Sequence, residues 1–259
     1  MALFTDGPIS NILDLSARDS QLLSVASTEN IDVTQKMLLA QDEIGLELVT
    51  MLDRLSYVDQ AFWLAPQPGL NNVVVTPALK LWHVLRSLEL VYADAFNNQL
   101  NDRYGGKRNQ FHDLAKWAGE KLIQIGVGIC TCPVAQPAIP TLVTALPAVG
   151  GRPLPDNTYY VTTAWVNTHG EEGASAVPNA ISTSGATIGV DPGPVPPNAV
   201  AWNVFIGIAP DMMTLQNGNQ IPAGQTWLQP GVLATSARMP GTGQSPAYIK
   251  PVPRMLQRG

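Results

Sequence analysis

The feature that most constrains the fold is the uneven distribution of proline and glycine along the 259 residues. Residues 129–259 contain 18 of the 22 prolines and 14 of the 22 glycines, whereas residues 1–128 contain 25 of the 35 Asp, Glu, Lys and Arg residues. Proline and glycine are unfavourable inside helices but common in the turns between short strands. We therefore expect a helical first half and a β-rich second half.

Apolar residues in the first half recur at intervals of three, four and seven, which is typical of amphipathic helices. Asp32 and Gln35 have the spacing of a capping box, and proline at Pro77 suits a first helical turn. Gly105-Gly106 is either a tight turn between two helices or a kink in one, and we favour the turn. The predicted helices are 8–15, 19–27, 33–55, one from Thr76-Pro77 to Leu100, and one from Phe111 to Ile125.

The second half contains short runs of aromatic and β-branched residues separated by turn signals, which indicate strands. Strands at this spacing suggest a β-sandwich of about 90 residues. The predicted strands are 141–146, 159–166, 180–184, 187–190, 201–208 and 226–228. The expected organisation is a helical domain at 1–128, a linker at 129–137, a sandwich at 138–231 and an extended tail at 232–259, which together make an α+β multidomain chain.

Charge and hydropathy exclude several classes of function. The net charge is −5 and no basic run occurs, so sequence-specific nucleic-acid binding is not expected. No stretch of about 18 apolar residues occurs, so no membrane span is expected, and residues 1–7 lack the pattern of a secretory signal.

Motifs for chemistry are also missing. The three histidines have no partner at metal-binding spacing, and Cys130 with Cys132 supplies too few ligands for a zinc site. There is no serine elbow, Walker loop or dinucleotide fingerprint. We therefore predict that the protein is not an enzyme and that it has no cofactor and no metal.

Two stretches resemble known families. Residues 79–104, Leu-Lys-Leu-Trp-His-Val-Leu-Arg-Ser-Leu-Glu-Leu-Val-Tyr-Ala-Asp-Ala-Phe-Asn-Asn-Gln-Leu-Asn-Asp-Arg-Tyr, with 39–48 upstream, resemble the helical head-to-tail connector (adaptor) proteins of tailed bacteriophages. Residues 159–175 and 201–207 are similar to the fibronectin type III or Ig-like modules often appended to phage virion proteins. They differ in having Gly173-Ala-Ser where Ser-Ala-Pro is usual, and the fold alone does not specify function.

The resemblance implies a structural protein of the virion neck, present in the host cytoplasm during assembly. It implies a ring of about twelve copies that binds the portal protein and receives the next neck or tail-completion protein. In that family a C-terminal extension often reaches the portal. The expected partner-interface residues are Val91, Asn101, Asp102, Arg103, Tyr104, Tyr248, Ile249, Lys250 and Arg254.

Tyr248, Ile249, Lys250 and Arg254 belong to the expected C-terminal tail, and the other five interface residues rest on two further features of the sequence. Val91 lies with Trp82 and Val84 on an apolar helix face opposite the main stripe. Residues 101–108 are the densest polar stretch, and are either a contact surface or an ordinary charged helix end. The alternative function is a virion decoration or adhesion module whose sandwich binds a host surface or glycan. An accessory domain of an enzyme is disfavoured because no catalytic domain is present.

Overall fold

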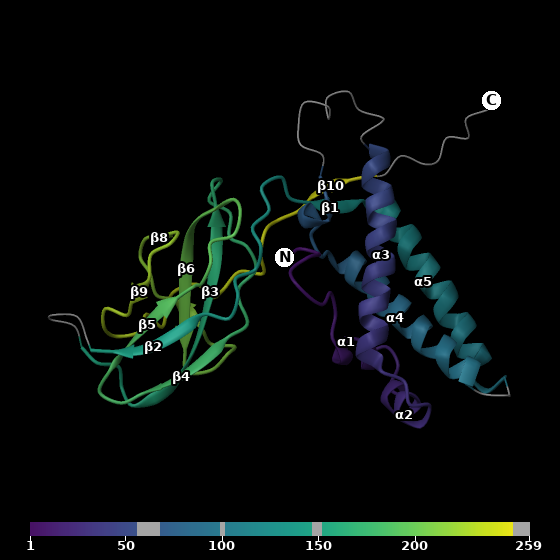
Figure 1. The fold of residues 1–259 in the computed structure, drawn as a ribbon, viewed down its shortest axis with the longest axis horizontal. Helices are drawn as coiled ribbons and strands as arrows, with labels where there is room; N and C mark the ends of the chain where they lie inside the picture. Colours follow the sequence, from purple (N-terminus) through teal and green to yellow (C-terminus); the bar gives the residue numbers. More distant parts are fainter. Residues whose placement is uncertain (56–67, 99–101, 147–151, 251–259) are drawn as a thin grey trace. The chain divides into compact units, whose positions relative to one another are not determined.

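The computed structural model describes residues 1–55, 68–98, 102–146 and 152–250, and it divides into two compact units. Met1–Asp6 and Cys130–Ser245 form the β unit, while Gly7–Ile129 and Pro246–Gly259 form the helical unit. Figure 1 shows the helices in one unit together with the short strands β1 and β10, and the other strands in the second unit. The predicted α+β class, with helices preceding strands, is confirmed.

Three long helices build the helical unit, with α4 packed against both α3 and α5. Their positions follow the apolar stripes, and the Asp32 carboxylate accepts a hydrogen bond from the Gln35 backbone N–H at 3.1 Å, as its predicted capping role requires. The helices are α1 (Ile12–Ser16), α2 (Leu22–Thr28), α3 (Val33–Leu55), α4 (Pro77–Asn98) and α5 (Gly105–Ile125), with short 3-10 turns at Leu70–Asn72 and Asp102–Tyr104.

The core of the helical unit lies on the inner stripe of α4. Leu88, Val91 and Tyr92 are at most 1% exposed there. The Tyr92 ring stacks on Phe111 of α5 with 5.4 Å between centroids. Aromatic pairs at this spacing add specificity to the burial of apolar area.

A two-stranded ribbon completes the helical unit and was not predicted from the sequence. It pairs β1 (Val127–Ile129) with β10 (Ala247–Ile249) in antiparallel register. Glycine is required at two positions beneath β10. Gly126 has φ +110°, and a Cβ on Gly128 would lie 2.7 Å from the Thr76 side chain and 2.9 Å from that of Pro246. Larger residues at these positions would push β10 away.

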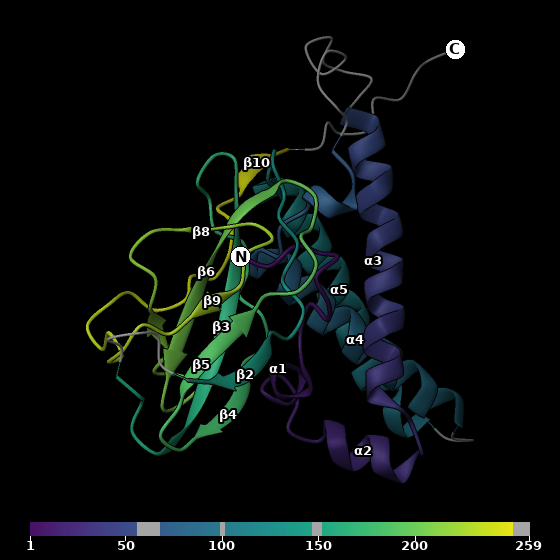
Figure 2. The ribbon, with the colours of Figure 1, turned by 60° about the vertical axis from the view of Figure 1, so that its left-hand side comes forward.

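The β unit contains two antiparallel sheets. One sheet has the strand order β2-β5-β9 and the other has the order β4-β3-β6-β7, with β8 also paired to β6. Figure 2 shows the long strands β3 and β6 side by side. The strands are β2 (Thr141–Ala145), β3 (Asn157–Asn167), β4 (Asn179–Thr183), β5 (Thr187–Asp191), β6 (Ala199–Gly207), β7 (Thr214–Leu215), β8 (Ile221–Pro222) and β9 (Trp227–Leu228). All six predicted strands are present.

The β-unit core lies between side chains of both sheets. Trp165 of β3 and Trp202 of β6 are directly opposite one another in register, and each is at most 1% exposed. Ile188 and Val190 of β5 join them in the same cluster. The Trp202 indole N–H donates to the Gln225 carbonyl at 3.1 Å, so its one polar group is satisfied.

Residues beyond 231 are divided between the two units. In the β unit, Arg238 pairs with Glu172, and Gln244 donates to the Cys132 carbonyl at 2.8 Å. The first six residues also belong to this unit, where the Met1 ammonium donates to the Gln244 carbonyl. The structure therefore differs from the expected division, in which residues 1–128 were one domain and residues 232–259 were one extended tail.

Candidate functional site

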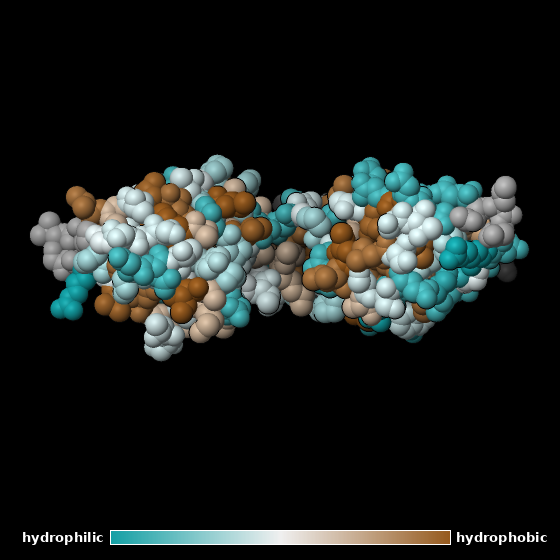
Figure 3. All heavy atoms as spheres, turned by 90° about the horizontal axis from the view of Figure 1, so that it is seen from below, coloured by the Kyte–Doolittle hydropathy of each residue, from teal (hydrophilic) through white to brown (hydrophobic). Residues whose placement is uncertain are grey.

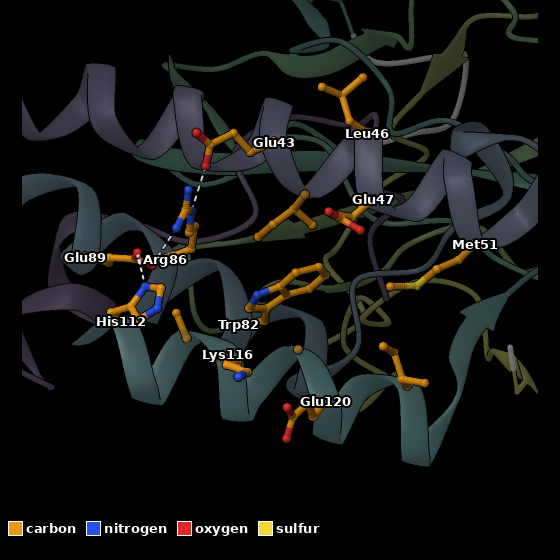
Figure 4. A pocket seen from close by; sticks show the side chains of 14 residues that line it. Glu43, Leu46, Glu47, Met51, Trp82, Arg86, Glu89, His112, Lys116 and Glu120 are labelled. Carbon is orange, nitrogen blue, oxygen red and sulfur yellow. Dashed lines mark hydrogen bonds and ion pairs between the residues drawn. The ribbon is translucent and has the colours of Figure 1, made fainter. Parts of the chain in front are cut away.

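A groove of about 530 Å³ lies in the helical unit. Side chains of α3 form one wall, side chains of α5 form the other, and α4 supplies the floor (Figure 4). The groove exists because α4 packs on both neighbouring helices.

One end of the groove is a connected polar network. Arg86 donates from Nε to Glu43 Oε2 at 2.7 Å and from Nη1 to Glu89 Oε2 at 2.6 Å. His112 Nδ1 lies 2.8 Å from Glu89 Oε1. Residues from three helices are thereby joined, since Glu43 belongs to α3, Arg86 and Glu89 to α4, and His112 to α5.

Glu89 is only 8% exposed, so its charge is stabilised by Arg86 and by the His112 contact rather than by water. Burial alone would lower the pKa of Arg86, but its hydrogen bonds to Glu43 and Glu89 outweigh burial and raise that pKa above the ordinary value. Arg86 is therefore a fixed positive charge that holds two carboxylates in place. This end of the groove is therefore a connected network of charged side chains from three helices.

The middle of the groove is apolar, and the Trp82 ring forms its floor. The indole packs on Gly119 of α5 so closely that a Cβ there would lie 3.1 Å from Trp82 Cε2. Glycine at this position therefore lets the ring lie flat against the helix. Met51 and Ile123 extend the apolar surface on either side.

The rim of the groove carries both exposed apolar and acidic groups. Leu46 is 72% exposed and Ile123 is 39% exposed. Glu47 on α3 and Glu120 on α5 lie on opposite sides of the Trp82 ring (Figure 4). Among the described residues, neither glutamate forms an ion pair; of the two basic side chains that line the groove, Arg86 is paired with Glu43 and Glu89, and Lys116 lies on the same helix as Glu120. An apolar strip between acids is suited to binding a segment with apolar and basic side chains.

A second hollow, of about 450 Å³, lies between the N-terminal segment of the helical unit and α3. At its base the Ser10 hydroxyl lies 2.8 Å from His83 Nδ1, and His83 Nε2 lies 2.9 Å from the Met37 carbonyl. Because a carbonyl only accepts, Nε2 carries the proton and Nδ1 accepts from Ser10.

This serine–histidine pair does not have the access that a nucleophile requires. Ser10 is 3% exposed and His83 is 0% exposed. Burial lowers the pKa of His83, against the smaller opposing effects of the Met37 hydrogen bond and the Asp14 charge, which keeps the ring neutral. The pair therefore ties the N-terminal segment to α3 and α4.

The structure places the expected partner-interface residues in different environments. Val91 is 0% exposed in the helical core, so the expectation that it faces a partner is wrong. Its helix has neighbours on two sides, α3 and α5, and this buries the face that was assumed to be free. Trp82 is partly buried in the groove, and Val84 is also in the core.

Tyr104 is also buried, at 5% exposure, and its hydroxyl donates to Glu29 at 3.0 Å. It is therefore a packing residue, whereas its neighbours Asp102 and Arg103 are exposed. Tyr248 is 50% exposed and Lys250 is exposed, while Ile249 is partly buried; Tyr248 and Ile249 belong to β10. Asn101 and Arg254 lie outside the described residues.

The groove residues were not identified as a site from the sequence. One signal was available, since Arg86 and Glu89 have the i,i+3 spacing that places two side chains on one face of a helix. The partners Glu43 and His112 come from other helices and required the tertiary structure.

Within the described ranges, no group of three or more His, Cys, Asp or Glu side chains is arranged to hold a metal ion. Neither Cys130 nor Cys132 forms a disulfide. Among the helices that the structure describes, none is both long and apolar enough to cross a membrane.

Comparison with known proteins gives no identification of this chain. No protein-family model matches it, and no curated protein matches it.

Proposed function

We propose that this chain is a head-to-tail connector subunit of a tailed bacteriophage, which forms a ring between the capsid portal and the tail. The proposal combines the resemblance of residues 79–104 to connector proteins with one structural observation. The outer faces of the long helices carry large exposed apolar side chains.

On α3, the side chains of Leu38, Leu39 and Val49, which do not line the groove, are between 39% and 47% exposed, and on α5 the Trp117 side chain is 47% exposed. Figure 3 shows hydrophobic side chains gathered on the surface of the helical unit, in the right-hand part of the view. Contiguous apolar surface of this kind is typical of protein–protein contacts.

A ring needs two different surfaces on each copy, because neighbours in a ring contact each other head to tail. The apolar faces of α3 and α5 belong to different helices and are suited to such a contact. The partners of this proposal are further copies of the chain, the portal protein and the next neck protein, and the site of action is the virion neck.

We further propose that the β unit is an Ig or fibronectin type III-like sandwich. In its support, the two antiparallel sheets share one core, and β6 lies beside β3 although β4 and β5 intervene in the sequence. Such crossovers are usual in Greek-key sandwiches. The alternative, an adhesion module, is less well supported because Trp202 is fully buried and Trp227 is packed against the core.

The test is native mass spectrometry of the purified chain, alone and with the cognate portal ring. We expect a species of low copy number that gains about twelve copies on the portal. A Leu39→Gln/Val49→Gln variant should lose most ring assembly while the free energy of unfolding changes by less than about 0.5 kcal/mol per site, since both side chains are exposed. The proposal would be refuted if the wild-type chain did not bind the portal ring.

A further inference from the structure

We propose that residues 251–259 of this chain bind in the groove between α3, α4 and α5 of the same helical unit. These residues, Pro-Val-Pro-Arg-Met-Leu-Gln-Arg-Gly, lie outside the described part of the structure. The proposal rests on the chemistry of the groove and of the segment, and on the place where the described chain ends. It does not depend on the proposed ring.

The charge pattern of the segment complements that of the groove. Arg254 and Arg258 flank an apolar pair, Met255 and Leu256, and the segment contains no acidic side chain. The groove has an apolar floor with one glutamate on each rim, Glu47 on α3 and Glu120 on α5, although Lys116 also lines the α5 side.

The acidic rim groups are available for this contact. Glu43 and Glu89 already share Arg86, but Glu47 and Glu120 form no ion pair among the described residues. We assign the two arginines of the segment to these two glutamates, which lie on either side of Trp82 (Figure 4). Arginine is suited to such pairs because its planar fork fits a carboxylate.

The apolar pair accounts for the exposed surface of the groove. Leu46 is 72% exposed and Ile123 is 39% exposed, and the Trp82 ring lies between α3 and α5. Methionine and leucine side chains adapt well to irregular apolar floors. Covering this strip removes apolar area from water, which favours binding.

The segment also starts close to the groove. Ile249 pairs with Val127, and α5 ends at Ile125, so the chain passes Lys250 beside the end of the groove helix. The groove follows α5 back to His112, which is about 20 Å at 1.5 Å per residue. Nine extended residues span about 30 Å, so the segment is long enough to fill the groove of its own unit.

The test traps the contact in the full-length chain by disulfide formation. Cys130→Ala and Cys132→Ser remove the native thiols, and Leu46→Cys with Leu256→Cys places one thiol at the groove and one in the segment. The matched control replaces Leu46→Cys with Leu39→Cys, which is on the same helix, is 43% exposed and does not line the groove. Peptide mass spectrometry after mild oxidation gives the rate, and far-UV circular dichroism verifies folding.

We expect the 46–256 disulfide to form at least about tenfold faster than the 39–256 disulfide, at a rate independent of protein concentration. Adding Glu47→Lys/Glu120→Lys should reduce this rate about tenfold, because two attractions become repulsions. Asp42→Lys/Asp113→Lys makes the same change in charge outside the groove and should leave the rate unchanged.

Three results would overturn the proposal. Equal rates for the 46–256 and 39–256 pairs would show that the segment has no preference for the groove. If both charge-reversal pairs slowed the 46–256 disulfide equally, the segment would be attracted by the overall negative charge of the helical unit and not by Glu47 and Glu120. A rate that rises with protein concentration would show that the segment of another copy occupies the groove.

Discussion

The two units achieve cohesion in different ways. In the helical unit, long stripes of apolar residues on α3, α4 and α5 form the core, and most charged groups lie at its edge. In the β unit, the tryptophan core is surrounded by polar side chains that bind backbone groups of loops and chain ends. The apolar stripes of the helical unit are a periodic pattern in the sequence. The polar contacts of the β unit depend on single residues that are far apart in the sequence.

The hydrogen bonds around Glu172 are an example of such polar contacts in the β unit. Glu172 accepts from both Nη atoms of Arg238, from Asn203 Nδ2 at 2.6 Å and from the Gly241 N–H at 3.2 Å. Burial alone would raise the pKa of Glu172, but the hydrogen bonds from Arg238 and Asn203 outweigh it and lower the pKa below the ordinary value. The Glu172 carboxylate thereby joins strand β6, which contains Asn203, to the segment that contains Arg238 and Gly241.

The largest expected effect contrasts two tryptophans. Trp202→Ala should lower the free energy of unfolding of the β unit by about 3–5 kcal/mol, because a fully buried ring is lost. Trp82→Ala should cost the helical unit only about 1–2 kcal/mol, since that ring lines an open groove. Guanidinium denaturation followed by hydrogen-exchange mass spectrometry reports each unit separately. Equal losses would mean that the groove floor is as well packed as the β core.

The next effect contrasts two carboxylates. Glu172→Ala should destabilise the β unit by about 2 kcal/mol, because Arg238, Asn203 and Gly241 lose their acceptor. Glu43→Ala should lower the free energy of unfolding of the helical unit by less than about 1 kcal/mol. The Glu43 side chain is 37% exposed, and Arg86 still forms its ion pair with Glu89 in the variant. The same denaturation assay measures both variants. A larger loss for Glu43→Ala would reverse the proposed contrast.

The smallest effect concerns pH and His83. Its pKa in the folded chain lies below the unfolded value of about 6.5, so the unfolded chain binds the proton more readily. The stability contributed by the neutral ring is complete above that pH and is lost as pH falls from 6.5 towards the folded pKa. Denaturation of the helical unit at pH 7 and pH 5 should show this loss.

The control for this prediction is His83→Gln, which removes the titrating ring. The variant should be less stable at pH 7, because contacts to Ser10 and Met37 are altered, but its stability should fall less between pH 7 and pH 5. An identical fall in the variant and the wild type would assign the pH dependence to another group.

Much of the fold was predictable because periodic patterns specify it. The stripe that predicts a helix at 33–55 matches α3, and the aromatic run at 159–166 lies within β3. The β1–β10 ribbon was missed because a strand of three residues shows no periodic pattern, and because Cys130–Ser245 of the β unit separate the two strands in the sequence. The pairing depends on glycines that permit close approach, which no local pattern reveals.

The candidate site was less predictable than the fold. Val91 was placed on a surface because one helix considered alone has an outer face, whereas α4 has neighbours on two sides. The groove needed three helices to be placed before Glu43, Arg86 and His112 became neighbours. The exposure of side chains such as Leu46 likewise depends on how the helices pack, and the periodic pattern of the sequence does not reveal it.

The exchange of chain ends between the units affects the order of events during synthesis on the ribosome. The helices emerge first, followed by the whole β unit, and β10 emerges only afterwards. Until then β1 has an unpaired edge, although its neighbouring helices are complete. The helical unit therefore completes its β1–β10 ribbon only after residues 247–249 are translated, and a chain stalled before residue 247 has an unpaired strand edge to which a second molecule can pair.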